Sequence, residues 1–204
     1  MAKIKNLLFD LGGVLLNIDY NKTANAFKNL GIHQFDELYS QAGANHLFEA
    51  LETGEISEDD FYNTIQQYCY PSTTQQQIEV AWNAILLNFR IESLDYLAQL
   101  REKYNIYLLS NTNSIHLTAF NKILREETGK PNLDNYFIKV YYSHKIHKRK
   151  PYVTTYLFVV EDAGIIADET LFIDDSFGNI EGAKEAGLQV YHLLPNHKIE
   201  DITL

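Results

Sequence analysis

The sequence predicts an α/β protein whose core is a doubly wound, mostly parallel sheet, with an inserted all-helical domain. Two observations carry this prediction. From residue 90 onward, short apolar segments that end in polar residues alternate with amphipathic helical segments, which is the pattern of parallel βαβ units. Between residues 17 and 89 helical spacing dominates instead, and strand signals are few. We therefore assign residues 1–16 and 90–204 to the core and residues 17–89 to the helical insertion.

The first strand is expected from Lys5 to Phe9, because its leucines and phenylalanine suit a strand that is covered on both faces. Asp10 follows directly, and Gly12 and Gly13 allow the backbone to turn sharply beside it. Open α/β sheets place their chemistry at the carboxyl ends of their strands, where Asp10 would lie. An acid in this position more often caps a turn, so the later segments decide between the two interpretations.

The insertion is predicted to contain four short amphipathic helices. Ala24 and Phe27 mark the first helix, and Phe35 begins the second. Ser57, which is followed three residues later by Asp60, forms a variant capping box that starts the third. The fourth helix is expected to carry one apolar face, which we interpret as core packing. That face comprises Ile78, Trp82, Ile85, Leu86 and Phe89.

Two later strands of the predicted core also end in polar residues. One strand leads into Ser110 and Asn111, and a later one leads into Asp174 and Asp175. Taken alone, each of these clusters could cap a helix. Because the carboxyl ends of parallel strands lie at one edge of a sheet, all four residues can meet there beside Asp10. The core strands after residue 90 are expected at 106–109, 137–142, 170–173 and 188–193.

These residue types suit phosphoryl transfer. A carboxylate that attacks a phosphate dianion at about 3.5 Å meets a repulsion on the order of 10 kcal/mol, so positive charge is required. Lys150, which precedes Pro151, supplies one positive charge, and carboxylates such as Asp174 and Asp175 can hold Mg²⁺ through oxygen ligands. Asp10 is then the candidate nucleophile, which would form an aspartyl-phosphate that water hydrolyses.

The remaining phosphoryl oxygens need hydrogen-bond donors. Ser110 and Asn111 are the candidates, because each can donate to oxygens on which negative charge develops during the reaction. We therefore predict Asp10, Ser110 and Lys150 as catalytic residues, and Ser110, Asn111 and Lys150 as the residues that bind the phosphoryl group.

Four segments resemble the ordered motifs of the haloacid dehalogenase superfamily, and together they span essentially the whole chain. They are Phe9–Val14, Leu109–Asn113, Arg149–Pro151 and Phe172–Asp175. More narrowly, residues 54–57, residues 110–113 with His116, and residues 179–183 resemble bacterial phosphatases that act on α-glucose 1-phosphate. The resemblance implies that Asp10, the Gly12 carbonyl, Asp174 and Asp175 hold Mg²⁺, and that the insertion is a helical cap that closes over the substrate.

One position departs from the family pattern. Most phosphatases of this superfamily carry a second aspartate two residues after the nucleophile as general acid and base, and here that position is Gly12. Asp19 is a candidate substitute, although an acid at that place also suits the start of a helix. His116 is a weaker candidate, because we expect it to face solvent or to pack on its helix. In the cap, the sequence does not separate a specificity residue such as Phe48 or Glu52 from a packing residue.

Composition narrows the function further. The formal net charge of −10 disfavours a nucleic-acid or anionic-membrane partner, and a single cysteine, Cys69, favours a reduced cytoplasmic setting. The expected activity is Mg²⁺-dependent hydrolysis of a small phosphate monoester, in particular a sugar phosphate. Two alternatives are kept: a non-catalytic protein that binds phosphate and metal, and a 2-haloacid dehalogenase, which needs no metal. The sequence leaves the oligomeric state open.

Overall fold

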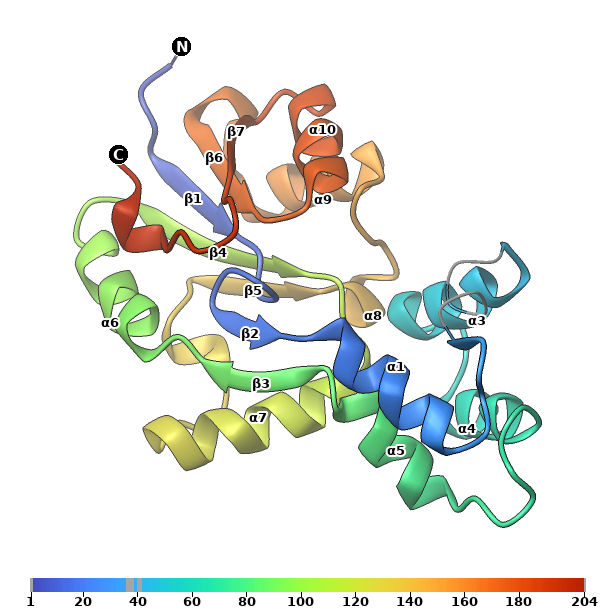
Figure 1. Ribbon diagram of the computed structural model, residues 1–204. Helices are drawn as coiled ribbons and strands as arrows, with labels where there is room; N and C mark the ends of the chain where they lie inside the picture. The colour runs from blue at the N-terminus through green and yellow to red at the C-terminus, as the bar shows by residue number, and fades with distance from the viewer. Residues whose placement is uncertain (1, 36–38, 40–41, 204) are drawn as a thin grey trace.

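The computed structural model describes residues 2–35, 39 and 42–203, and for residues 42–45 it describes the backbone alone. A five-stranded sheet, parallel throughout, forms the centre of the molecule in the order β5-β4-β1-β6-β7 (Figure 1). Its strands are β1 Asn6–Phe9, β4 Asn105–Ser110, β5 Lys139–Tyr142, β6 Thr170–Asp174 and β7 Gln189–His192. The prediction of a mostly parallel, doubly wound sheet is therefore confirmed.

Helices cover both faces of this sheet, and the alternation of side chains along β1 shows how. Leu7 and Phe9 pack in one apolar cluster with residues of α6 and α7, whereas Leu8 points to the other face and packs with residues of α9 and α10. All three side chains are fully buried. The core helices are α6 Ile91–Leu100, α7 Ser114–Thr128, α8 Ser143–Ile146, α9 Val153–Ala163 and α10 Phe177–Glu185, with short 3₁₀ turns η1 Leu133–Asn135, η2 Ala167–Glu169 and η3 Ile199–Asp201.

The insertion has an apolar cluster of its own, in which Phe27, Phe48, Phe61 and Trp82 are buried together with Ile115 of the core helix α7. Trp82 packs as expected, and the predicted capping box of Ser57 and Asp60 is present. The helices described are α1 Tyr20–Asn29, α3 Ala42–Thr53, α4 Glu58–Gln66 and α5 Gln75–Asn83. This separate cluster supports the division into a core and a cap, which stays a prediction.

The expectation of a fourth helix running to Phe89 is wrong. Helix α5 ends at Asn83, and residues Leu86–Phe89 form β3, which pairs antiparallel with β2, Leu16–Ile18. The spacing of Leu86 and Phe89 also fits a helix face, but pairing with Ile18 and Leu16 decides the outcome. The insertion is thus joined to the core by a two-stranded ribbon, so it is not helical at its base (Figure 1).

Among the described helices, none combines the length and the apolar character that a membrane crossing requires.

Candidate active site

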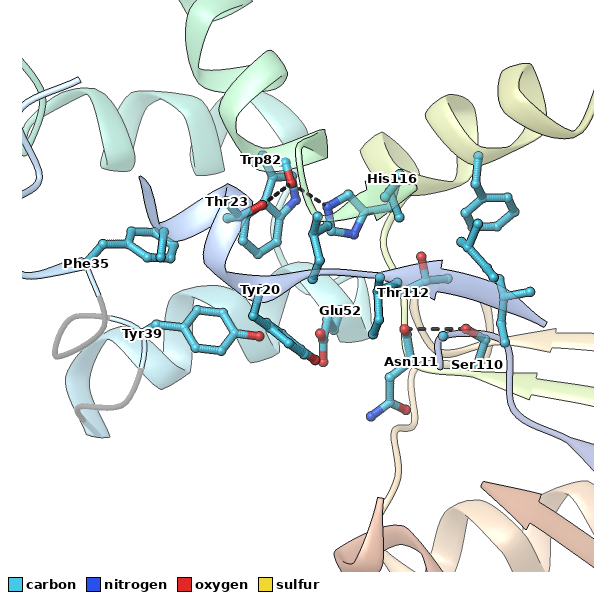
Figure 2. A pocket seen from close by; sticks show the side chains of 18 residues that line it. Tyr20, Thr23, Phe35, Tyr39, Glu52, Trp82, Ser110, Asn111, Thr112 and His116 are labelled. Carbon is cyan, nitrogen blue, oxygen red and sulfur yellow. Dashed lines mark hydrogen bonds between the residues drawn. The ribbon is translucent and has the colours of Figure 1, made fainter. Parts of the chain in front are cut away.

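The central strands of the sheet bring the predicted site residues together. Asp10 follows β1 directly, Ser110 is the last residue of β4, and Asp174 is the last residue of β6. Strands β4 and β6 flank β1 on either side, so all three side chains lie at the same edge. Ser110 and Asn111 line a cavity that opens between this edge and the helices of the insertion (Figure 2). The structure therefore brings Asp10, Ser110 and Asp174 together at one edge of the sheet, as the sequence predicted.

Lys150 forms the centre of this cluster. Its Nζ lies 2.6 Å from Oδ1 of Asp10 and 2.7 Å from Oδ2 of Asp174, and its side chain is 1% exposed. Two carboxylates against one ammonium leave a net charge of −1 in a nearly dry site. Burial raises the pKa of Asp10 to about 7, even though the charge of Lys150 opposes this shift. A further cation beside Asp10 would lower this pKa and favour the ionised carboxylate that a nucleophile requires.

Three acids could hold such a cation. Oxygen atoms of Asp10, Asp174 and Asp175 all lie within 4.8 Å of one another. Carboxylate oxygens are the ligands that Mg²⁺ prefers, so the donor set fits this ion. A side chain at position 13 would collide with the Asp175 carboxylate, so Gly13 lets that acid approach the turn after β1. The roles of these acids and of the Gly12 carbonyl as metal ligands stay predictions.

The two consecutive acids have different surroundings. Asp174 is fully buried and accepts from the Ser176 backbone N–H at 2.8 Å, from Nδ2 of Asn179 at 3.0 and 3.1 Å, and from Lys150. These contacts use about all the lone pairs that a carboxylate offers. Asp175 is exposed. The geometry therefore favours Asp175 as the more accessible metal ligand and gives Asp174 the task of orienting Lys150.

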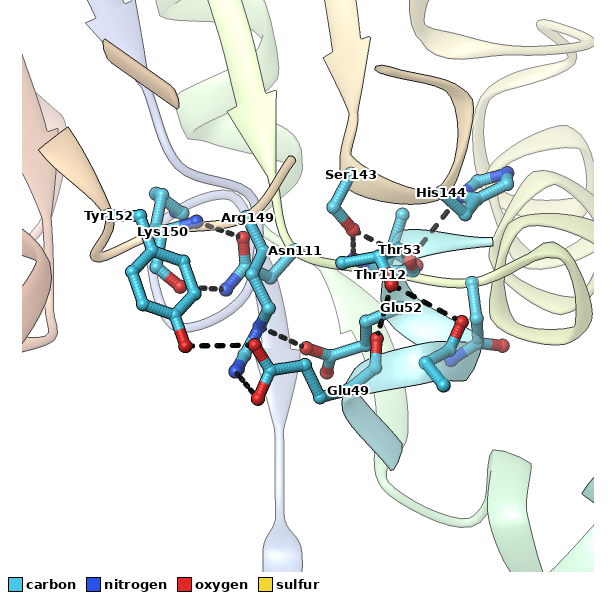
Figure 3. Close-up of polar contacts among 12 residues, drawn as sticks. Glu49, Glu52, Thr53, Asn111, Thr112, Ser143, His144, Arg149, Lys150 and Tyr152 are labelled. Atoms are coloured by element: carbon cyan, nitrogen blue, oxygen red, sulfur yellow. Dashed lines mark hydrogen bonds and ion pairs between the residues drawn. The ribbon is translucent and has the colours of Figure 1, made fainter. Parts of the chain in front are cut away.

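Asn111 holds the backbone of Lys150. Its Oδ1 accepts from the Lys150 N–H at 2.9 Å, and its Nδ2 donates to the Lys150 carbonyl at 2.9 Å (Figure 3). A similar clasp joins the ends of β4 and β5, where Ser143 Oγ accepts from the Thr112 N–H and donates to its carbonyl. Asn111 thus positions the lysine, and its predicted contact with phosphate stays a prediction.

Position 12, where the acid is missing, has little room for a side chain. A Cβ at Gly12 would lie 3.2 Å from Cδ1 of Ile18, which occupies the space beside the turn. Asp19 does not fill the role: its carboxylate accepts from the Asn21 N–H at 2.9 Å as the N-cap of α1, and it is not among the described residues that line the two cavities at the site. The alternative interpretation of Asp19, a helix-start acid, is the one that the structure supports.

His116 was expected to face solvent or to pack on its own helix, α7, but its ring packs against Trp82 of α5. Its Nδ1 lies 3.1 Å from Nδ2 of Asn113, its Nε2 lies 3.1 Å from the Trp82 carbonyl oxygen, and its ring stacks on the Trp82 ring with centroids 4.7 Å apart. The carbonyl can only accept, so Nε2 carries the hydrogen of a neutral imidazole. Burial lowers the pKa of His116 to about 4. This residue therefore joins the core to the insertion as a neutral ring.

The insertion and the core enclose two adjoining cavities. A cavity of 490 Å³ is lined by Asp10, Lys150 and Asp175, and a second of 330 Å³ reaches Trp82 and His116. Both cavities are lined by Tyr20, Tyr39 and Glu52, which lie where the cavity with the acids meets the cavity that reaches Trp82 (Figure 2). Volumes of this size suit a small metabolite.

Sequence reasoning missed part of this wall. Tyr20 was not predicted as a site residue, and Arg149 was named only as the first residue of the segment Arg149–Pro151, without a role of its own. Of the two cap residues left undecided, Phe48 packs in the apolar cluster and Glu52 lines the cavities. The tip of the insertion also docks closely on the core: a Cβ at Gly54, whose φ is +69°, would lie 2.5 Å from the His144 carbonyl oxygen.

Comparison with known proteins adds independent findings. A family model described as haloacid dehalogenase-like hydrolase matches residues 4–187. A D-ribitol-5-phosphate phosphatase of Bacteroides thetaiotaomicron is 34% identical over 188 residues, which cover 92% of this chain and 91% of that protein.

Solved structures agree. A haloacid dehalogenase family enzyme of Bacteroides thetaiotaomicron has a TM-score of 0.89 at 37% identity, with 98% of both chains covered, and further structures of that enzyme contain magnesium and inorganic phosphate. A predicted HAD-like family hydrolase of Porphyromonas gingivalis has a TM-score of 0.86 at 34% identity and covers 96% of this chain and 94% of its own.

Proposed function

The chain belongs to the haloacid dehalogenase-like hydrolases, and from this premise we propose that it is a magnesium-dependent phosphatase that hydrolyses a small sugar or alditol phosphate. The observation that carries this proposal is the cluster of Asp10, Lys150 and Asp174, with Asp175 beside it, at one buried edge of the sheet. A nucleophile, a fixed positive charge and a set of metal-binding acids are thereby within reach of one phosphoryl group.

The chemistry takes two displacements. A carboxylate oxygen of Asp10 attacks phosphorus, the bond from phosphorus to the ester oxygen breaks, and the departing alcohol takes a proton from water. Water then attacks the aspartyl-phosphate, which releases inorganic phosphate and restores the Asp10 carboxylate. Lys150 neutralises charge on the phosphoryl oxygens, and Ser110 donates to them. A bound Mg²⁺, held by Asp10, Asp175 and the Gly12 carbonyl with Asp174 beside them, would neutralise part of the negative charge through which the nucleophile and the phosphate repel each other.

The substrate is proposed at the level of a chemical class. The sequence resembles enzymes of α-glucose 1-phosphate, whereas the relative with 34% identity is a phosphatase of D-ribitol 5-phosphate. The two esters differ in their leaving groups, but both leaving groups are uncharged and carry several hydroxyl groups. We extend this shared class to the present chain. Location in the cytoplasm also remains a proposal, which rests on the single cysteine, Cys69.

Phosphate release tests this function. The purified protein is assayed with D-ribitol 5-phosphate, glucose 1-phosphate, glucose 6-phosphate and phenyl phosphate, in Mg²⁺ and in EDTA. We expect turnover of at least one ester in Mg²⁺ and none in EDTA. Phosphate binding by calorimetry without turnover of any ester would support the non-catalytic alternative, and chloride release from 2-chloropropionate in EDTA would support the dehalogenase.

A further inference from the structure

Arg149, the residue before Lys150, joins the core to cap helix α3 through two carboxylates. Its Nε lies 3.0 Å from Oε2 of Glu52, and its Nη1 lies 3.5 Å from Oε2 of Glu49 (Figure 3). Glu49 also accepts a hydrogen bond of 2.9 Å from the Tyr152 hydroxyl. Two acids thus share one guanidinium; burial raises the pKa of Glu52, and the charge of Arg149 opposes this shift.

Glu49 and Glu52 differ in whether they line the cavities at the site. Glu52 lines both cavities at the site, whereas Glu49 is not among the described residues that line either of them. The Glu52 side chain is 16% exposed, and the contact with Arg149 engages its Oε2. Within the described part of the chain, Glu52 is thus an anchored carboxylate on the cavity wall, and Glu49 shares the anchor without reaching the cavity.

The neighbours of Glu52 suit a hydroxylated ligand. The rings of Tyr20 and Tyr39 lie beside its carboxylate, with both hydroxyls directed toward the same space (Figure 2). Burial and the nearby charge of Glu52 raise the pKa of Tyr20 to about 12, so its hydroxyl stays protonated. Carboxylates accept strong hydrogen bonds from hydroxyl groups, and they repel other anions in a poorly hydrated cavity.

We propose that Glu52 is a specificity-determining residue, which accepts a hydrogen bond from a hydroxyl group of the leaving alcohol and excludes phosphate esters that carry a second anionic group. The inference rests on the proposed phosphatase function and adds the substrate class: neutral, polyhydroxylated monophosphates. Arg149 lies against the Glu52 carboxylate as an ion-pair partner, and its charge favours the ionised form that burial opposes.

The competing explanation is that Glu52 only fastens the cap to the core through Arg149. Glu49 provides the matched control, because Glu49→Gln weakens the contact with the same guanidinium without altering the cavity wall. Glu52→Gln keeps the shape of the side chain, and Arg149 retains Glu49 as a partner, so we expect both variants to fold. Circular dichroism and the melting temperature of each variant check this.

The test measures kcat/KM for three esters: D-ribitol 5-phosphate, phenyl phosphate, which has no hydroxyl, and 3-phosphoglycerate, which carries a carboxylate. We expect Glu52→Gln to lower kcat/KM for ribitol phosphate by about 10- to 100-fold, the range for one charged hydrogen bond. Phenyl phosphate should change by less than about threefold, and the activity on phosphoglycerate relative to phenyl phosphate should rise. Glu49→Gln should leave all three ratios unchanged.

A second variant distinguishes the hydrogen bond that the Glu52 carboxylate accepts from the effect of its negative charge. Glu52→Asp shortens the side chain but keeps the negative charge, so it should lose the preference for ribitol phosphate while it still excludes phosphoglycerate. The proposal is overturned if Glu52→Gln lowers kcat/KM for all three esters equally, or if Glu49→Gln shifts the ratios as much. Turnover of phenyl phosphate by the unaltered enzyme shows separately that the phosphatase function holds.

Discussion

Arg149 and Lys150 are consecutive in the sequence, and each bridges two carboxylates, yet the two groups differ in the distances between their charges and in their exposure. Lys150 lies 2.6 and 2.7 Å from two core acids whose side chains are at most 11% exposed. Arg149 lies 3.0 and 3.5 Å from two cap acids whose side chains are 16% and 31% exposed. The first group is tight and almost dry, and the second is looser and partly hydrated.

Two neighbouring residues, Arg149 and Lys150, thus serve two different tasks. A buried charge cluster is costly to disturb, because removing one member leaves the others without compensation. Such a cluster suits chemistry that requires fixed groups. A partly exposed ion pair contributes little stability, and here it places Glu52 of the cap on the wall of the cavity. Substitutions in and around the two groups test this contrast between the buried Lys150 cluster and the partly exposed Arg149 pairs.

Asp10→Asn should lower kcat by about 10⁴-fold or more, because the amide is a poor nucleophile and a weaker metal ligand. Asp19→Asn is the matched control, since Asp19 caps α1 and should affect kcat by less than about threefold. Steady-state phosphate release measures both. Substantial activity of the Asp10 variant would disprove the covalent mechanism, and a large loss in the Asp19 variant would restore Asp19 as the general acid.

Lys150→Ala should destabilise the protein by about 3 kcal/mol or more, because two buried carboxylates lose their partner. Arg149→Ala should cost less than about 1 kcal/mol, as expected for a partly exposed pair. Urea unfolding at pH 7 compares the two variants. Equal losses of unfolding free energy would show that the two groups are energetically alike, contrary to their geometry.

Asp175→Asn should raise the Mg²⁺ concentration for half-maximal activity by at least about 10- to 100-fold, the range seen even for indirect metal contacts. Asp174→Asn should mainly lower kcat, because Asp174 orients Lys150 while its oxygens are already hydrogen-bonded. Activity measured against Mg²⁺ concentration in both variants distinguishes a metal ligand from a residue that orients Lys150. Equal increases in the Mg²⁺ requirement would make Asp174 as direct a ligand as Asp175.

His116 should make stability depend on pH. Its folded pKa is about 4, below the unfolded value near 6.5, so the unfolded chain binds more protons between these values. The contribution is present above about pH 6.5 and is lost as pH falls toward 4, by about 3 kcal/mol in total. Unfolding free energies at pH 7 and 5 should converge in His116→Gln. An unchanged difference would mean that other groups carry the dependence.

Much of the fold followed from local patterns. The strands before Asp10, Ser110 and Asp174 were predictable because short apolar segments that end in polar residues are typical of buried parallel strands. The capping box at Ser57 was equally local. The strand from Leu86 to Phe89 was not predictable, because its apolar spacing also suits a helix and only the distant pairing with Leu16 and Ile18 selects the strand.

The family, the parallel sheet and the meeting of Asp10, Ser110, Lys150 and the two acids follow from the sequence, because chain order and strand direction place the strand ends at one edge. The task of each polar group at that edge is visible only in the folded protein. Asn111 clasps the Lys150 backbone, and Glu52 reaches the cavity while Phe48 packs. Such roles depend on contacts between segments that are separate in the sequence, and no local pattern in a single sequence records those contacts.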